Sequence, residues 1–241
     1  MNRSLRTAAK LAAFAGAAAL LSGCAANNLH IAGNSPLRNA AFVQKEFKGH
    51  AFVLGTVTAA SSQMQATANH TLPTEAYLEL LRNDLEKAFK NAGLNNGTKP
   101  AYRVDVEVDQ FYFKSGVGGF HVGHLYATDT IIGGNSTIHI PIKLWDGGGY
   151  IYGYWHAPVW DYCRRLIPLT AIYTDKAILR LKNGERITSG SLGTSGDVAG
   201  QHIDLYNLGK FGIKELTKSE IEKVTGYSVQ QLHAFDKSSG A

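Results

Sequence analysis

The stretch that decides the fold is residues 102–109, YRVDVEVD, in which apolar or aromatic side chains alternate strictly with charged ones. A period of two places alternate side chains on opposite faces of a β-strand. The alternation therefore predicts a strand with one face against the core and the other in water.

The apolar partner of this strand precedes it in the chain. Residues 74–93 begin with Thr74, which can cap a helix, and Glu75, which suits a helix N-terminus, and they end at Gly93. Between them, large apolar residues recur at steps of three and four, as on one face of a helix. These residues are Tyr77, Leu78, Leu81, Leu85, Ala88 and Phe89.

Residues 51–60, AFVLGTVTAA, are rich in β-forming residues without a helical period, which predicts a largely buried strand. The polar segment 95–100 is a turn-rich connection between the helix and the strand at 102–109. Strand, helix, strand is thus the expected first unit of the fold.

Glycines change the pattern in the next segment. Six of them fall within residues 115–134, which indicates either a long mobile loop or a hairpin softened by glycine. Long loops in compact domains are often functional, so this is the first place to look for a binding surface.

Two further hairpins are expected. Residues 137–145 and 150–156 flank a Gly-rich turn, and residues 178–182 and 185–188 flank Asn183-Gly184. Asn-Gly is a strong signal for a two-residue hairpin turn. The second half of the chain is therefore expected to be mainly antiparallel β.

Short helices are expected outside the sheet. Ser35-Pro36 can start one that Gly49 ends, and capping boxes at residues 217–220 and 228–231 predict two more near the C-terminus. Together the elements predict an α+β fold, an antiparallel or mixed sheet with one main amphipathic helix packed on it and short C-terminal helices.

The first 23 residues have the order of an export signal: basic residues, a short apolar run over residues 11–21, and small residues before Cys24. That run is about half of the ~20 residues that span a bilayer, which favours a cleaved leader over a permanent span. Residues 21–24, LSGC, resemble the lipobox of bacterial lipoprotein precursors. The resemblance implies diacylglycerol and further acyl chains such as palmitate on Cys24, which together hold stably to a membrane.

The resemblance also implies an address. Ala25 and Ala26 follow the cysteine, where enteric lipoproteins retained at the inner membrane often have Asp. By that rule the expected location is the periplasmic face of the outer membrane, with the inner membrane as the alternative. Residues 1–23 are then a signal peptide, 24–35 a tether, and 36–241 a single periplasmic domain.

Charge and cysteine content agree with export. The leader holds three of the 24 Lys and Arg residues and none of the 19 Asp and Glu, so the mature chain has a formal charge of only +2 and no basic excess typical of nucleic-acid binding. Cys163 then has no partner for a disulfide within the chain, and we interpret it as a buried apolar residue. The alternative is a reactive or intermolecular thiol, which Arg164 and Arg165 could activate.

No chemical motif is complete. His121, His124 and His139 form the tightest histidine cluster, but no cysteine or carboxylate lies at ligand spacing, so we expect no metal and no cofactor. The carboxylates Asp105, Glu107 and Asp109 are the wet side of a strand, without an identifiable acid or base partner.

The most distinctive mature segment is aromatic, residues 150–162, YIYGYWHAPVWDY. Such rings serve either as core or as a recognition surface, since Tyr, Trp and Arg are enriched at interface centres. The candidate partner surface comprises Tyr152, Tyr154, Trp155, Trp160, Arg164 and Arg165.

We interpret the chain as a membrane-anchored, non-enzymatic adaptor or binding module of the bacterial envelope, with an envelope protein as partner. The order of elements over residues 50–156 resembles small periplasmic adaptor lipoproteins, such as activators of cell-wall synthases. Two alternatives stay open: a subunit of an oligomeric envelope channel or secretion complex, and an envelope enzyme acting on glycan or peptide.

Overall fold

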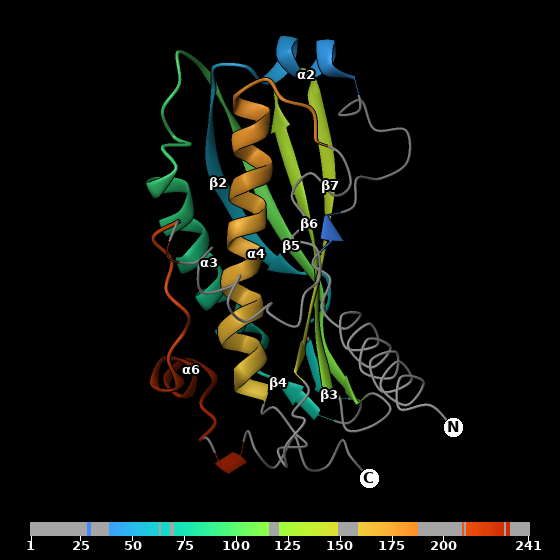
Figure 1. Cartoon of the computed structure of the whole chain (residues 1–241), viewed down its shortest axis with the longest axis vertical. Helices are drawn as coiled ribbons and strands as arrows, with labels where there is room; N and C mark the ends of the chain where they lie inside the picture. Colours follow the sequence, from blue (N-terminus) through green and yellow to red (C-terminus); the bar gives the residue numbers. More distant parts are fainter. Residues whose placement is uncertain are drawn as a thin grey trace, which may run out of the picture.

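The computed structural model describes residues 28–29, 39–62, 64–67, 70–115, 121–148, 159–187, 209, 211–228 and 230–231. A five-stranded sheet has the strand order β1-β7-β6-β5-β2, and β3 and β4 form a separate pair. Helices α3 and α4 lie against one face of the sheet (Figure 1). The predicted α+β class is confirmed, and the sheet is mixed because β2 runs parallel to β5 while the other neighbours are antiparallel.

The elements have the following bounds: β1 Asn28–Leu29, α2 Ala40–Phe47, β2 His50–Ala59, β3 Met64–Thr67, β4 His70–Leu72, α3 Thr74–Asn91, β5 Lys99–Ser115, β6 His121–Gly133, β7 Ser136–Gly148, α4 Val159–Lys182 and α6 Lys218–Thr225. Within the part of the chain that is described, no helix has the length and apolar character that crossing a membrane requires.

The order β2-α3-β5 follows the sequence prediction, with the β3–β4 pair inserted before the helix. The prediction that this first strand is largely buried is wrong, because β2 lies at the edge of the sheet and buries only Ala51, Phe52 and Val57. Along β5 the residues Tyr102, Val104, Val106 and Val108 are buried, and the charged residues between them face away from the helices. A register shift between Val108 and Gln110 then moves the phase by one residue, so that Phe111 is also buried. An extra residue of this kind is a β-bulge.

Helix α3 buries its predicted apolar face, including Leu81, Leu85 and Phe89. Its N-terminus differs from the prediction: Pro73 occupies the cap position, and Thr74 donates its hydroxyl hydrogen to the Ser62 carbonyl at 3.0 Å instead of capping the helix. Proline fixes φ near the helical value, which permits a start without a side-chain cap.

The Gly-rich segment resolves in favour of a hairpin. Residues 121–133 form β6, which pairs with both β5 and β7, so the mobile-loop alternative is wrong for this part. Residues 116–120 lie outside the described chain. Strand β7 continues through the predicted turn to Gly148, and the predicted strand at 150–156 also lies outside the described residues.

The hairpin predicted around Asn183-Gly184 is wrong, because α4 extends to Lys182. Gly184 has φ +77° and donates to the Leu181 carbonyl at 2.9 Å, while Glu185 donates to the Arg180 carbonyl at 2.8 Å. A glycine in the left-handed region is a standard helix C-terminus. The same Asn-Gly pair thus ends a helix instead of joining two strands.

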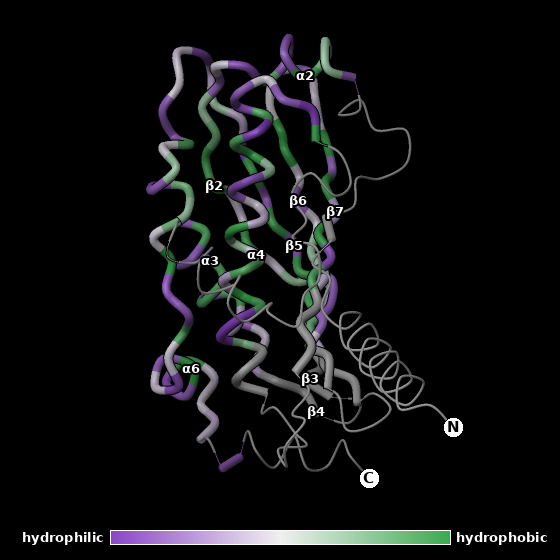
Figure 2. The backbone as a smooth tube through the Cα atoms, in the orientation of Figure 1, coloured by the Kyte–Doolittle hydropathy of each residue, from purple (hydrophilic) through white to green (hydrophobic). Residues whose placement is uncertain are grey.

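Helix α4 is the central element of the core. From Cys163 to Ala177 only Arg164 and Lys176 are not buried, because the helix lies among the sheet, α2, α3 and α6. Figure 2 shows apolar segments on β5 and β6 and on the two long helices. The main core is therefore the layer between the sheet and the α3–α4 pair.

The short helices α2 and α6 were predicted, but the predicted start of α2 is wrong. Asn39, not Ser35, caps α2, since its side chain accepts from the Phe42 N–H at 3.1 Å. The capping box of α6 is present between Thr217 and Glu220, and Gly226 ends that helix with φ +70°. Ser228 and Gln231 exchange the equivalent hydrogen bonds at the start of the next turn.

Candidate functional site

The candidate partner surface predicted from sequence is only partly described. Tyr152, Tyr154 and Trp155 lie outside the described residues, and Trp160 lies in α4 with its side chain outside the description. Arg164 forms an ion pair with Glu215 at 2.8 Å.

Arg165 does not fit a recognition surface. Only 7% of it is exposed, since it lies on α4 where the helix is enclosed by its neighbours. In the folded chain its guanidinium is therefore not presented to a partner.

Cys163 is a buried thiol, as we expected from the sequence. Its sulfur lies 2.8 Å from the Tyr77 hydroxyl, and burial, together with the neighbouring thiol, raises the pKa of Tyr77 well above its ordinary value. A thiol at 0% exposure is out of reach of solution reagents. The reactive-thiol alternative is wrong for this structure.

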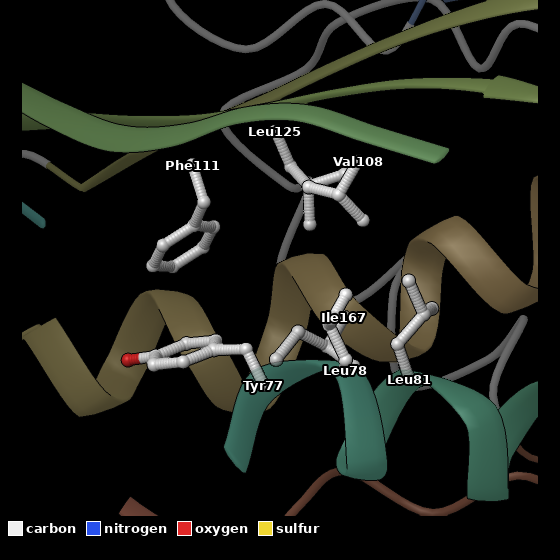
Figure 3. A pocket seen from close by; sticks show the side chains of 7 residues that line it. All are labelled: Tyr77, Leu78, Leu81, Val108, Phe111, Leu125 and Ile167. Carbon is white, nitrogen blue, oxygen red and sulfur yellow. The ribbon is translucent and has the colours of Figure 1, made fainter. Parts of the chain in front are cut away.

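An apolar pocket lies beside this pair, between α3, α4 and the sheet (Figure 3). Its cavity volume is about 10 Å³, room for roughly one water molecule and far below the ~300 Å³ at which ligand pockets begin. The Tyr77 hydroxyl is the polar atom among the drawn lining side chains, which are Tyr77, Leu78, Leu81, Val108, Phe111, Leu125 and Ile167. The pocket is a gap in side-chain packing and offers no group for chemistry.

Of the histidines considered as metal ligands, the structure separates His124 from His139, and the side chain of His121 lies outside the description. His124 pairs with Trp145 and His139 with Thr130, so six residues of β6, or about 20 Å, separate the two positions. His139 Nδ1 lies 3.0 Å from the Thr130 hydroxyl. The described residues contain no group of three metal-ligating side chains.

The surface with the clearest organisation is the face of the sheet opposite α3 and α4, which we call the open face. It carries the residues that alternate with the buried ones on β5, β6 and β7. Those with described side chains include Arg103, Asp105, Glu107, Asp109, Thr128, Thr130, His139 and Lys143.

Charge is ordered across the open face. On β5, Asp105 accepts from the Thr56 N–H at 2.8 Å and pairs with Arg103 at 2.9 Å, and Asp109 accepts from the Thr128 hydroxyl at 3.1 Å. Glu107 lies exposed between these two carboxylates. The predicted wet side of β5 is confirmed as a row of carboxylates.

Beyond the β-bulge the open face becomes aromatic. Tyr112 and His124 stack with ring centroids 4.8 Å apart and planes 17° apart. The hydroxyl of Tyr126 lies 3.2 Å from His124 Nδ1, and Lys143 Nζ lies 5.9 Å from the centre of the Tyr126 ring. We call Tyr112, His124 and Tyr126 the aromatic cluster, and all three are half-buried.

Sequence reasoning did not identify this cluster. The bulge after Val108 puts Tyr112 on the open face. Pairing of β5 with β6 then brings Tyr112 beside His124, which is twelve residues further along the chain. The available signal was the Gly-rich segment, which was expected to contain a binding surface and which supplies His124 and Tyr126.

Buried carboxylates form a second unusual feature, on the helix side of the sheet. Asp129 is buried on β6 and accepts from the Thr174 hydroxyl at 3.3 Å, and desolvation raises its pKa to about 8. Desolvation likewise raises the pKa of Asp175 to about 7 and that of Asp84 to about 6. At neutral pH the Asp129 carboxyl is therefore mainly protonated, whereas Asp84, which pairs with Lys87 at 3.3 Å, is mainly ionised, and all three residues are buried.

Comparisons with known proteins add little. No family model matches the chain, and no curated protein matches it. Among solved structures, a PelC dodecamer from Paraburkholderia phytofirmans is 10% identical, with 67% of this chain and 98% of that chain covered and a TM-score of 0.25. A variant of the same dodecamer is 14% identical, with 58% and 92% covered and a TM-score of 0.24. A likeness at these TM-scores supports no argument about this chain.

Proposed function

We propose that the chain is a lipid-anchored envelope protein that works as a non-enzymatic adaptor, with the open face of β5 and β6 as its partner-binding surface. The anchor part of the proposal rests on the resemblance of residues 21–24 to a lipobox and on the leader that precedes them. The binding part rests on the open face.

The observation that carries the binding proposal is the aromatic cluster beside the carboxylate row. Tyr112, His124 and Tyr126 are held in fixed mutual geometry by stacking and by a hydrogen bond, so they lose little conformational freedom when a partner covers them. Tyrosine is also among the residue types that dominate binding energy at interface centres.

The chemistry of the surface limits the partner. Glu107 and Asp109 adjoin the aromatic cluster along β5, so a complementary protein surface presents Lys or Arg beside apolar side chains. Arg103 neutralises Asp105 in an ion pair, so Glu107 and Asp109 are the main source of negative charge on this surface.

Two experiments test the proposal. Incorporation of labelled fatty acid is compared between the wild type and Cys24→Ala; absence of label in the wild type removes the anchor. A photo-crosslinking residue is placed at Glu107, with Asn83 on the exposed side of α3 as the matched control position. We expect a specific envelope protein to be captured from position 107 only, and to be lost when Tyr112 is replaced by Ala. Equal capture from both positions contradicts the binding surface.

A further inference from the structure

The position of β1 limits how far the lipid can lie from the folded domain. Asn28 pairs with Lys143 and Leu29 with Ile142, so the range predicted to be a tether contains a strand joined to the sheet. Cys24 precedes Asn28 by four residues, which span at most about 14 Å when fully extended. If Cys24 is lipidated, the β7 side of the sheet is held within that distance of the membrane.

The direction of β1 narrows the position further. Because β1 runs antiparallel to β7, the chain enters it from the side of Leu144 and Trp145. Trp145 pairs with His124, which belongs to the aromatic cluster. The anchor therefore approaches the sheet at the end where the cluster and Lys143 lie.

The charges on the open face suit this orientation. The residues of β7 that alternate with buried Ile138, Ile140, Ile142 and Leu144 are Thr137, His139, Pro141 and Lys143, among which there is no carboxylate. The carboxylate row lies on β5, two strands or about 10 Å away. Lysine near an anionic bilayer surface is attracted to it, and Lys143 is exposed on β7.

We propose that the β7 side of the sheet, through Lys143 and His139 on its open face, docks directly on the phospholipid headgroups of the membrane that holds the anchor. This inference rests on the proposed lipidation of Cys24 and adds a second, non-covalent contact with the same bilayer. Docking turns the β5 row away from the bilayer, where a partner protein can reach it.

The test uses the mature chain coupled through Cys24 to a maleimide lipid, so that it does not depend on processing in cells. The vesicles contain phosphatidylethanolamine, phosphatidylglycerol and a brominated phospholipid that quenches fluorescence. A fluorescent amino acid is placed either at His139 on the open face or at Asn83 on α3, both exposed and on opposite sides of the sheet. Because a brominated phospholipid quenches only a fluorophore that it approaches closely, we expect most of the quenching at position 139 and little at position 83.

A charge reversal provides the decisive variant. Lys143→Glu should bring quenching at position 139 down to the level at 83, whereas Lys99→Glu, with the same charge change at the start of β5, should leave it unchanged. Equal quenching at 139 and 83, or indifference to Lys143→Glu, overturns docking. Capture of a protein instead of phospholipid by a photo-crosslinker at 139 in cells also overturns it. Absence of fatty-acid label on Cys24 in cells would contradict the proposed lipid anchor but not the docking, because the vesicle measurement attaches the lipid chemically.

Discussion

The backbone N–H of Leu216 donates to the carbonyl of Arg164 at 3.3 Å. In a regular helix that carbonyl would accept from the residue four positions later, which is Pro168 and has no N–H. Leu216, which is 48 residues beyond Pro168, thus supplies the missing donor. The Arg164–Glu215 ion pair holds the segment around Leu216 at the same place on α4. Buried backbone acceptors are nearly always satisfied, and here the donor also fixes the C-terminal segment on α4.

Replacement of Pro168 by Ala should loosen this attachment. The new N–H can bond to the Arg164 carbonyl within α4, so we expect amide hydrogen exchange at Leu216 to become faster. Stability should rise by less than the ~3 kcal/mol that proline costs inside a helix, because the Leu216 bond already offsets part of that cost. Hydrogen exchange by mass spectrometry over residues 211–217 measures the effect. Unchanged exchange in this segment would show that the donor from Leu216 is not coupled to Pro168.

Gly97 allows the loop after α3 to approach β2 closely. A Cβ on Gly97 would overlap with the Ala51 nitrogen and lie 2.8 Å from the His50 carbonyl carbon, both of them backbone atoms. Gly97→Ala should therefore destabilise the fold by about 1–3 kcal/mol, as overpacking does.

Urea denaturation of Gly97→Ala against Gly209→Ala measures this effect. A Cβ on Gly209 meets nothing within 4 Å, so that variant should keep the wild-type midpoint. Two equal midpoints would refute the close approach at Gly97.

The parts of the fold that were predictable are those with one buried and one wet side. The alternation in residues 102–109 and the stripe on α3 each reveal their orientation because solvent imposes a polar face. Helix α4 gives less of that information: it is buried on nearly all sides, so it has no continuous polar face to reveal its orientation. Pro168 and Asn183-Gly184 then gave signals that usually interrupt a helix.

The candidate site was predictable only as a region. Glycine content marked residues 115–134, but the aromatic cluster depends on the bulge between Val108 and Gln110, which shifts the phase of β5. A shift of one residue exchanges the two faces of a strand, so Tyr112 could not be assigned to the open face without the register.

Lys182 links the ends of the two long helices. Its Nζ donates to the carbonyls of Gly93 and Leu94, which follow the C-terminus of α3. Lys182→Met keeps much of the side-chain volume but leaves these part-buried acceptors without their donor, so we expect a loss of about 1–3 kcal/mol. Thermal unfolding checks this, with exposed Lys45 of α2 replaced by Met as the control. A loss of the same size in both variants would point to general charge rather than to these hydrogen bonds.

The buried carboxylate of Asp129 should make stability depend on pH. Burial raises its pKa to about 8, whereas an unfolded chain titrates it near ~3.9. Between these values the unfolded chain has released a proton that the folded chain retains, so stability is greatest below about pH 4 and falls as the pH rises toward 8, by up to ~1.4 kcal/mol per pH unit. Asp129→Asn cannot ionise and should therefore flatten this decline and raise stability at pH 8.

Urea denaturation at several pH values between 5 and 9 tests the role of Asp129, with Thr174→Val as the informative companion. The Thr174 hydroxyl donates to Asp129 at 3.3 Å and lowers the pKa of the carboxyl, opposing the larger effect of burial. Its loss should raise that pKa further and extend the decline in stability to higher pH, the opposite of the effect of Asp129→Asn. Parallel pH profiles for wild type and both variants would mean that Asp129 does not take up a proton on folding. Asp175, with a pKa raised to about 7, would then have to carry the dependence, and Asp175→Asn would flatten it below pH 7.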